Sequence, residues 1–319
     1  MAVLIGIDEA GFGPILGPLV VSSSSFLVQD HLLTSDLWCV LRRSIAKKHK
    51  QLSGRLLITD SKKAYRKSLG IKHLQRTVLS TFRCLGKEPA TIADFIKLLC
   101  PDCLERLNGY PWYKDVISRE IFADGADITV ASAVLADDLS SNGIKLLELK
   151  SRCLDVAYYN RMMSSMKNKA NVLFSTTSQL IKNAFDSYTD SNLHIIVDRQ
   201  GGRVRYRENL QRMFSGMELK IEQESPQASI YELKADGRLM RVHFVVDADE
   251  NFLPVSLASM VSKYLRELLV NNINRYFLTF CPALKPTAGY WKDGLRFIED
   301  LRTNIPHIQF DSKQLIRCR

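Results

Sequence analysis

Residues 1–18 read MAVLIGIDEAGFGPILGP, in which a short apolar run ends in an acidic pair and a loop rich in Gly and Pro. The run at 2–8 has the composition of a β-strand, and a second such run follows at 19–28 (LVVSSSSFLV). Two β-rich runs that flank a Gly/Pro turn predict two paired strands. The acidic pair, Asp8 and Glu9, therefore lies where the first strand ends.

The same criteria predict further elements along the chain. We expect strands at 55–59, 193–197, 229–235 and 240–247, the last two as a hairpin around Asp236-Gly237, and helices at 36–48, 66–84, 176–187, 203–215 and 254–277. Apolar residues in the last helix recur at i, i+3, i+4 spacing, which predicts that one face packs inward. A first strand followed by mixed strands and helices favours an α/β sandwich.

Composition narrows the class of protein. The chain has 319 residues, of which 46% are hydrophobic and 24% charged, so it can bury a large core. No apolar run approaches the roughly 18 residues that a membrane-spanning helix needs. The seven cysteines are mostly scattered, which indicates reduced thiols in the cytoplasm. We expect a cytoplasmic protein with no membrane association and no obligate protein partner.

One pair of cysteines stands apart from the others. Cys100-Pro-Asp-Cys103 has the spacing of half a zinc site or of a redox pair. No second pair and no nearby His follows at ligand spacing. The sequence therefore favours ordinary buried or surface thiols at this position.

The charge is unevenly distributed. There are 44 Lys and Arg against 34 Asp and Glu, a net charge of +10. The window 41–80 holds twelve basic residues and one acid, Asp60, so it alone carries +11. A clustered excess of this kind predicts a polyanionic partner such as nucleic acid. The alternative is a solvated basic surface.

Carboxylates follow three of the expected strands. They are Asp8 and Glu9 after the first strand, Asp198 after 193–197, and Asp247, Asp249 and Glu250 after 240–247. If these strands are neighbours, the acids converge, and their mutual repulsion requires cations. Oxygen ligands select hard ions such as Mg²⁺ or Mn²⁺, and a pair of such ions can cleave phosphodiesters. The alternative for each acid alone is a cap at a strand or helix end.

Five segments resemble, in order, motifs of the type 2 ribonucleases H (ribonucleases HII and HIII). They are GIDEAGFGPILGP (6–18), TDSKKAYR (59–66), IIVDRQGG (195–202), DADENFLPVSLASMVSKYLREL (247–268) and PTAGY (286–290). The resemblance implies a ribonuclease H-like fold, with a mixed sheet flanked by helices and a helical C-terminal part. Residues 86–147 have no counterpart, so we expect them to form an insertion or small subdomain within a catalytic domain made of 1–85 and 148–319.

The resemblance also implies a function. It implies that the RNA strand of RNA–DNA hybrids is cleaved by two-metal-ion hydrolysis with Mg²⁺ or Mn²⁺. The implied catalytic residues and metal ligands are Asp8, Glu9, Asp198 and Asp249, with Glu250 as the alternate for Asp249. The implied nucleic-acid contacts are Gly11, Phe12, Gly13, Ser61, Lys62, Lys63, Lys263 and Tyr290. The family has Arg where this chain has Phe12, so a cation beside the strand phosphate is expected to be missing.

Two other functions remain open at this point. A structure-specific DNA nuclease could share the fold and the acids, with a different substrate. A non-catalytic nucleic-acid-binding protein could use the basic window alone. The acids disfavour the second alternative, because negative charge beside phosphate does not assist binding.

Overall fold

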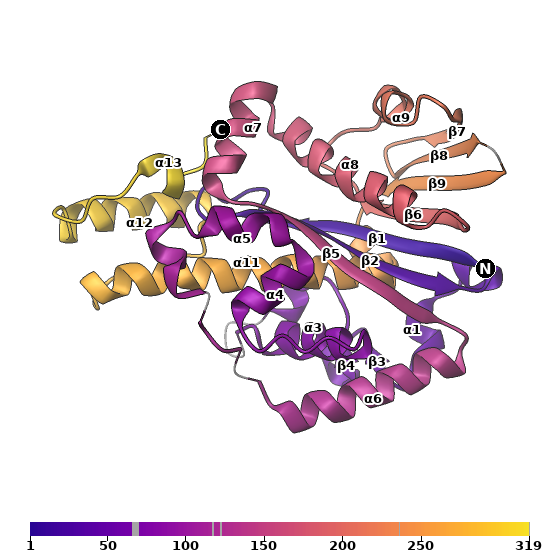
Figure 1. Cartoon of the computed structure of the whole chain (residues 1–319), viewed down its shortest axis with the longest axis horizontal. Helices are drawn as coiled ribbons and strands as arrows, with labels where there is room; N and C mark the ends of the chain where they lie inside the picture. Colours follow the sequence, from indigo (N-terminus) through magenta and orange to yellow (C-terminus); the bar gives the residue numbers. More distant parts are fainter. Residues whose placement is uncertain (66–69, 117, 122, 236, 319) are drawn as a thin grey trace.

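A central mixed β-sheet organises the protein (Figure 1). The structure, a computed structural model, describes residues 1–65, 70–116, 118–121, 123–235 and 237–318. The sheet has seven strands in the order β5-β2-β1-β6-β9-β8-β7. Their bounds are β1 (Ala2–Ala10), β2 (Leu19–Val28), β5 (Lys145–Leu154), β6 (Asn192–Asp198), β7 (Glu218–Glu224), β8 (Ala228–Ala235) and β9 (Arg238–Val245). The strands β1, β6 and β9 run parallel to one another, and β2 is antiparallel to both of its neighbours.

Helices cover the sheet on both faces (Figure 1). One apolar cluster lies between the sheet and α7 (Val156–Met166), α8 (Lys169–Ser187) and α9 (Arg207–Met213). The other lies under α11 (Leu253–Phe280) and includes α3 (Lys72–Cys84), α4 (Ile92–Leu99), α5 (Pro101–Leu107), α6 (Gly125–Ser141) and α12 (Trp291–Asn304). Shorter elements are α1 (Leu37–Val40), α2 (Ser61–Ala64), α10 (Ala248–Asn251), α13 (Ser312–Leu315), the 3₁₀ turns η1 (Asp30–Thr34), η2 (His49–Gln51) and η3 (Pro111–Val116), and the strand pair β3 (Ile45–Ala46) and β4 (Leu56–Leu57). The predicted fold class, a mixed sheet flanked by helices with a helical C-terminal part, is confirmed.

Small side chains let α11 approach the sheet closely. A Cβ placed on Gly6 of β1 would lie 2.1 Å from the carbonyl carbon of Pro254, at the start of α11. The Ser24 hydroxyl of β2 donates to the Pro254 carbonyl oxygen at 2.7 Å. The Ser262 hydroxyl of α11 contacts the Ser22 hydroxyl at 2.7 Å and donates to the carbonyl of Asp8 at 3.0 Å. The run of four serines in β2 therefore provides both space and hydrogen bonds for the helix.

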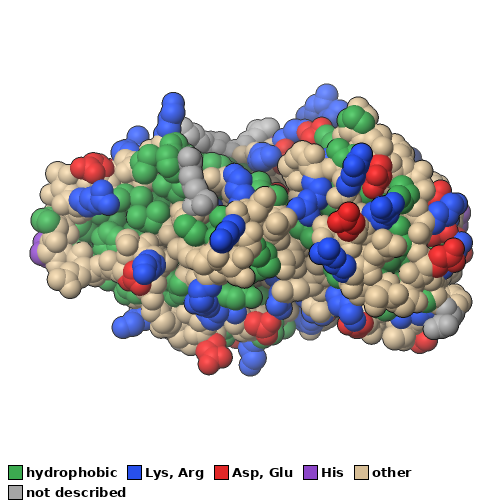
Figure 2. Space-filling view, turned by 90° about the horizontal axis from the view of Figure 1, so that it is seen from above, with side chains coloured by type: hydrophobic (Ala, Val, Ile, Leu, Met, Phe, Trp, Pro, Cys, Tyr) green, Lys and Arg blue, Asp and Glu red, His purple; other side chains and the backbone are tan. Residues whose placement is uncertain are grey.

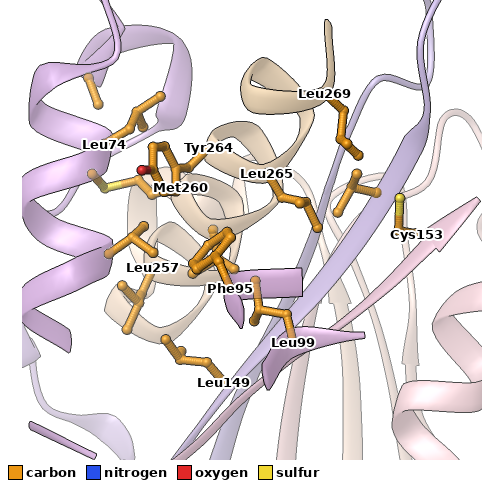
Figure 3. Close-up of a cluster of buried hydrophobic side chains, with 14 of the residues drawn as sticks. Leu74, Phe95, Leu99, Leu149, Cys153, Leu257, Met260, Tyr264, Leu265 and Leu269 are labelled. Atoms are coloured by element: carbon orange, nitrogen blue, oxygen red, sulfur yellow. The ribbon is translucent and has the colours of Figure 1, made fainter. Parts of the chain in front are cut away.

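The helix α11 is predicted to pack one face inward, and the structure buries more of it than that face. Twenty of its residues are buried, including polar residues such as Ser259 and Arg266. The sheet contacts one side of the helix, and α2, α3 and η3 contact others. Figure 3 shows Tyr264 and Met260 directed toward Leu74 of α3, and the Tyr264 ring lies 5.2 Å from that of Phe95 in α4. The helix is thus a central element of the core rather than a surface helix.

Other predicted elements differ in extent. Several predicted elements are confirmed with small shifts in their ends, namely the strands at 2–8, 19–28 and 193–197 and the helix at 254–277. The hairpin at 229–247 is confirmed as well. Its turn residue Asp236 lies outside the described residues. The prediction of a helix at 36–48 is wrong beyond Val40, where α1 ends. The buried Asp138 carboxylate accepts hydrogen bonds from the Ser44 amide at 2.9 Å and hydroxyl at 2.7 Å, and the chain then enters β3. A tertiary contact here overrides helical periodicity.

Two strands of the sheet, β5 and β7, were not predicted. In β5 the buried residues Leu149, Ser151 and Cys153 alternate with the less buried Glu148, Lys150 and Arg152. This alternation is the signature of a half-buried strand. The first residues of β5 belong to 86–147, and Phe95, Leu99 and Trp112 of that segment join the α11 core. The division of the chain at 86–147 stays a prediction.

A membrane-crossing helix is not found in the part of the chain that the structure describes, since no helix there is both long and apolar enough.

The seam between α11 and β1 gives the first prediction. We expect Gly6→Ala to lower the free energy of unfolding by about 2–3 kcal/mol, since its Cβ would overlap backbone atoms that cannot rotate away. Urea unfolding followed by circular dichroism measures the change. Gly216→Ala is the matched control, because a Cβ at Gly216 meets no atom within 4 Å. Equal stabilities of the two variants would show that the close approach is unimportant.

Candidate active site

Three parallel strands end at the same edge of the sheet, and each carries acids there. β1 pairs with β6 up to Ile7 and Val197, so Asp8 and Asp198 follow in adjacent strands. Asp198 lies opposite Val245, the last residue of β9. The chain then turns into α10, which carries Asp249. The strands with terminal carboxylates are therefore neighbours, as convergence of the acids requires.

These acids line one cavity of about 250 Å³. Its walls are formed by Asp8, Glu9, Ala10, Gly11, Phe12, Gly13, Pro14, Asp60, Ser61, Lys62, Asp198, Asp247, Asp249, Ser259, Lys263, Arg266 and Tyr290. Six carboxylates and three basic side chains thus share one space. Most of the residues that the sequence singled out are brought together here, namely Asp8, Glu9, Asp198, Asp249, Gly11, Phe12, Gly13, Ser61, Lys62, Lys263 and Tyr290.

Glu250 and Lys63 lie away from the cavity wall. Their side chains form an ion pair with a distance of 2.6 Å between Lys63 Nζ and Glu250 Oε1, and both are about half exposed. Asp249, next to Glu250 in α10, faces the cavity instead. The structure therefore separates the two alternatives for the fourth acid by position, with Asp249 among the other carboxylates.

Burial and repulsion raise the pKa values of the clustered acids. Burial, followed by repulsion from Glu9 and Asp198, raises the pKa of Asp8 well above its ordinary value. Burial and Asp198 raise the pKa of Glu9 to about 8. Burial raises the pKa of Asp249 to about 7 with help from Asp60 and Asp198, and it raises that of Asp198 to about 6. The cavity thus holds more negative charge than it can stabilise by itself.

Lys62 is one of the three basic side chains that line the cavity. Burial disfavours its ammonium, but Asp60, Asp249 and Asp8 outweigh burial and raise its pKa. Its amide also donates to Asp60 Oδ1 at 2.9 Å, which caps α2 and fixes the start of that helix. Three basic side chains against six carboxylates leave the cavity acidic.

Hydrogen bonds fix two of the acids and the serines beside them. Asp198 Oδ1 accepts from the Ala248 amide at 2.8 Å, which ties β6 to α10. The Glu9 amide donates to Asp8 Oδ1 at 2.7 Å. The hydroxyl of Ser259, in α11, donates to that of Ser61 at 3.0 Å. Elements distant in sequence therefore meet around the carboxylates.

A buried arginine supports the glycine loop. Arg266 is 1% exposed, and its guanidinium donates to the carbonyls of Ala288 at 3.0 Å and Leu16 at 3.3 Å. Gly11 has φ +94°, and a Cβ there would lie 2.6 Å from the Pro18 carbonyl oxygen and 2.7 Å from Arg266 Nε. Only glycine meets both constraints. The sequence reasoning did not select Arg266, although it follows Lys263 by three residues on the same helix.

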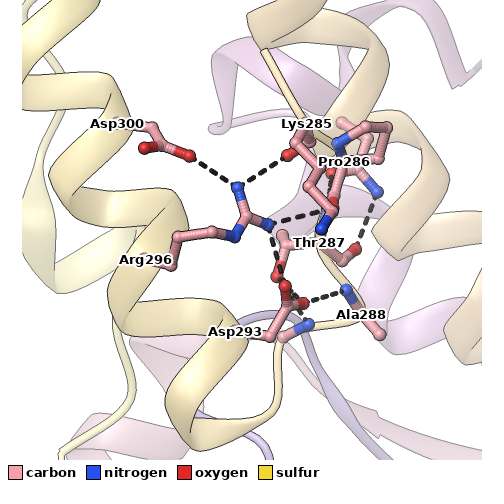
Figure 4. A network of polar contacts seen from close by, with 9 residues as sticks. Lys285, Pro286, Thr287, Ala288, Asp293, Arg296 and Asp300 are labelled. Carbon is pink, nitrogen blue, oxygen red and sulfur yellow. Dashed lines mark hydrogen bonds and ion pairs between the residues drawn. The ribbon is translucent and has the colours of Figure 1, made fainter.

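A polar network holds the loop that carries Tyr290 (Figure 4). Asp293 Oδ2 accepts from the Thr287 hydroxyl at 2.6 Å and from the Ala288 amide at 2.8 Å. Arg296 bridges Asp293, at 2.8 Å, to carbonyls of the preceding loop. Tyr290 itself stays 49% exposed at the cavity rim. Its ring is therefore available to a ligand, while its backbone is fixed.

A cation lies beside Phe12 after all. The Lys169 ammonium, at the start of α8, is 5.0 Å from the centroid of the Phe12 ring. Lys169 is exposed and Phe12 is half-buried. The two residues are far apart in sequence, and only the fold brings them together. The expected absence of a cation beside the strand phosphate stays a prediction.

The basic window is partly neutralised by ion pairs. Arg43 pairs with Asp137 at 2.8 Å, and Arg76 pairs with Asp127 at 2.5 Å. Arg66 and Lys67 lie outside the described residues. On the face shown in Figure 2, Lys and Arg side chains are interspersed with Asp and Glu rather than gathered into one stripe. Net charge alone therefore does not mark a binding surface on this face.

The donor set fits a hard divalent cation. It consists of carboxylate oxygens, which suit Mg²⁺ and Mn²⁺. Among the described residues, no three acidic, His or Cys side chains are arranged to hold an ion as they stand, so coordination requires rotation of carboxylate side chains. The raised pKa values of Asp8 and Glu9 are what an anionic cluster without counter-ions produces.

Proteins similar to this chain are found among solved structures. No protein-family model matches the sequence, and no curated protein matches it. Among solved structures, the chain is similar to the PCNA:RNase HII complex from Archaeoglobus fulgidus, with 15% identity and a TM-score of 0.49 over 99% of this chain and 94% of that one. It is also similar to Bst-RNase HIII in complex with Mn²⁺, with 13% identity and a TM-score of 0.46 over 99% of this chain and 66% of that one. A third similar structure is ribonuclease H2 from Pyrococcus horikoshii OT3, with 15% identity and a TM-score of 0.43, over 98% of this chain and 92% of that one. Likenesses at these values carry no argument about activity, so the site rests on its own geometry.

The pKa shifts predict opposite effects of pH and divalent metal on stability. The folded-state pKa values of Glu9, Asp198 and Asp249 lie above their ordinary values, at about 8, 6 and 7. The stability that they contribute is present below about pH 4 and is lost as the pH rises through 6 to 8. We expect the metal-free protein to melt at a lower temperature at about pH 8 than at about pH 5.5.

Adding Mg²⁺ or Mn²⁺ should raise the melting temperature, and more so at the higher pH, because the ligands must be deprotonated. Scanning calorimetry with EDTA or with metal measures both effects. Asp198→Asn should weaken them, whereas Asp190→Asn, at an exposed residue outside the cavity, should not. A metal-independent melting temperature at both pH values would contradict cation binding.

Proposed function

We propose that this protein is a metal-dependent endonuclease that cleaves the RNA strand of RNA–DNA hybrids. The proposal rests on one observation, the convergence of six carboxylates in a cavity that also contains a serine–lysine pair, a glycine loop and an exposed tyrosine. A non-catalytic binding protein would bear the cost of this buried negative charge without using it.

In the proposed site, Asp8, Glu9, Asp198 and Asp249 hold Mg²⁺ or Mn²⁺. When bound, a pair of such ions supplies an activated water and stabilises the leaving oxygen of a phosphodiester. The protein contributes the rigid strand ends that fix Asp8 and Asp198, and the hydrogen bond from Ala248 that orients the Asp198 carboxylate. Asp8 is 6% exposed, so its carboxylate is largely shielded from bulk water.

The remaining residues of the cavity supply substrate contacts. Ser61 and Lys62 lie beside the carboxylates, where a strand phosphate would approach. Lys263 lies on the same wall and pairs with Glu267 at 2.8 Å. The loop of Gly11 to Gly13 lines the same cavity as the acids and Tyr290, and in this proposal it contacts a ribose 2′-hydroxyl, which distinguishes RNA from DNA. Tyr290 offers its face to a base or sugar.

The substrate is tested by direct comparison. Labelled RNA–DNA hybrid, duplex RNA and duplex DNA are incubated side by side with Mg²⁺ or Mn²⁺. We expect cleavage of the RNA strand in the hybrid, with 3′-hydroxyl and 5′-phosphate ends. Cleavage confined to branched or duplex DNA would instead indicate a structure-specific DNA nuclease, and binding without cleavage would indicate a nucleic-acid-binding protein. The relative activity on single ribonucleotides within DNA stays a prediction, with continuous hybrid preferred.

Removing a metal ligand should separate binding from cleavage. We expect Asp8→Asn and Asp198→Asn each to lower the cleavage rate at least about a hundredfold, because several kcal/mol of transition-state stabilisation are lost. Hybrid affinity should stay similar or increase, since negative charge is removed near phosphate. Single-turnover rates and fluorescence anisotropy measure the two effects, with Asp190→Asn as the control. Parent-like turnover in either variant would rule out the proposed metal site.

Lys169 should contribute to binding through its charge. We expect Lys169→Ala to weaken hybrid binding and to reduce the slope of log affinity against log salt by about one. Lys182→Ala is the matched control, because Lys182 is also on α8 and lies over a ring, that of Phe185 at 5.8 Å, but it pairs with Asp186 and does not contact the loop that carries Phe12. Equal slopes for the two variants would remove Lys169 from the interface.

A further inference from the structure

Three cysteine side chains from distant parts of the chain meet on the side of the sheet covered by α4 and α5. Cys100 lies between these two helices, Cys103 lies in α5, and Cys153 lies in β5. The sulfur atoms of Cys100 and Cys103 are 3.4 Å apart, and Cys103 also hydrogen-bonds with Cys153. All three are free thiols that are at most 5% exposed. The fold thus adds a third thiol to the Cys100–Cys103 pair.

A small opening reaches these thiols. The three cysteines, with Asp102, Arg106 and Arg152, line a cavity of about 30 Å³. A cavity needs roughly 10–15 Å³ to hold one water molecule, so this one has room for about two. The two arginines and Asp102 form its more exposed side, with Arg152 bound to Asp102 at 2.8 Å. A molecule of two heavy atoms, such as hydrogen peroxide, therefore fits, whereas a peptide or a glutathione-sized disulfide does not.

The charges around the thiols favour a thiolate at one of them. Cys103 shares hydrogen bonds with the thiols of Cys100 and Cys153, and these, with the Arg106 guanidinium, hold its pKa well below the ordinary value despite burial. The pKa of Cys100 is raised, first by its hydrogen bond to Cys103 and then by burial. Arg106 is fixed by Asp155 at 2.6 Å and by the Cys153 carbonyl at 2.8 Å. Cys103 is thus the sulfur that contacts both other thiols, and it is the one whose ionisation these surroundings favour.

We propose that Cys100 and Cys103 form a peroxide-reactive dithiol site, in which Cys103 is oxidised first and Cys100 closes the disulfide. The Cys103 sulfur attacks one oxygen of hydrogen peroxide, the O–O bond breaks, and the other oxygen leaves as water after taking up a proton. The Cys103 sulfenic acid is then attacked by the Cys100 sulfur, the S–O bond breaks, and a second water leaves. Two thiols and one peroxide thus give one disulfide and two waters. The site is independent of the proposed nuclease function, and the failure of either leaves the other intact.

Two other uses of the cluster fit less well. The two arginines that line the cavity, Arg106 and Arg152, place positive charge beside the sulfurs and so disfavour a zinc cation there. Thiol–disulfide exchange with another protein needs an exposed sulfur, and Cys103 is 1% exposed. The narrow opening and the short contact between two sulfurs leave a small oxidant as the co-reactant.

Peptide mapping of the full-length protein tests the proposal. The reduced protein is treated with hydrogen peroxide, its remaining thiols are alkylated, and it is digested with trypsin. The fragment 98–106 (LLCPDCLER) contains both cysteines, and we expect it to escape alkylation and to lose about 2 Da, the mass of two hydrogens. Cys84 is an internal control, since it is a half-buried thiol whose pKa burial raises to about 11. It should be alkylated fully under the same conditions.

Variants separate the roles of the three thiols. Cys100→Ser should leave a Cys103 sulfenic acid that dimedone traps when the oxidised protein is unfolded in denaturant, and Cys153→Ala should still form the disulfide within 98–106. Oxidised glutathione should not replace peroxide. A fragment 98–106 that remains fully alkylatable at peroxide concentrations that oxidise the exposed Cys39 would overturn the proposal. A disulfide that joins 98–106 to 153–161 would overturn the pairing.

Discussion

The close approach of α11 to β1 and β2 is the constraint on which the rest of the structure depends. It requires that Gly6 have no side chain and that β2 present serines where a core strand would ordinarily present Val or Ile. Because α11 begins directly against Gly6, the preceding helix α10 is held at the ends of β6 and β9. The same contact brings Ser259 to Ser61 and Lys263 to the cavity wall. A single packing seam thus positions most of the candidate site.

The candidate site lowers the stability of the fold, whereas the packing of α11 on the sheet raises it. Packing places carboxylates together that repel one another, and their raised pKa values show that the fold pays a free-energy cost for this arrangement when no cation is present. Proteins retain such clusters where function needs them. The hydrophobic layers on both faces of the sheet supply the stability that offsets this cost. Stability and the proposed chemistry are therefore supplied by separate parts of the molecule.

The sequence could predict the features that depend on neighbouring residues, but not those that depend on contacts between distant elements. The acids at strand ends were readable because Asp8 and Asp198 directly follow apolar runs, and parallel neighbouring strands bring such residues together. The position of Asp249 relative to Glu250 depends on how α10 turns and on the ion pair with Lys63, so one sequence could not separate them. The burial of α11 on several sides, and the entry of β5 into the sheet, depend on elements that are far apart in the chain. The same holds for Lys169, which reaches Phe12 only because α8 crosses the end of β1.

The loop after β1 is fixed by buried cations at a cost in free energy. Besides Arg266, a second buried arginine, Arg317, donates to the carbonyls of Gly11, at 2.6 Å, and Pro14. Burial, followed by repulsion from Arg266, lowers the pKa of Arg317 to about 9. Glu267, whose Oε1 lies 3.5 Å from Arg266 Nη1, favours the charged form of Arg266 and opposes the effect of burial. The two arginines therefore tie the loop that lines the carboxylate cavity to α11 and to the C-terminal segment, and they do so against the mutual repulsion of two buried charges.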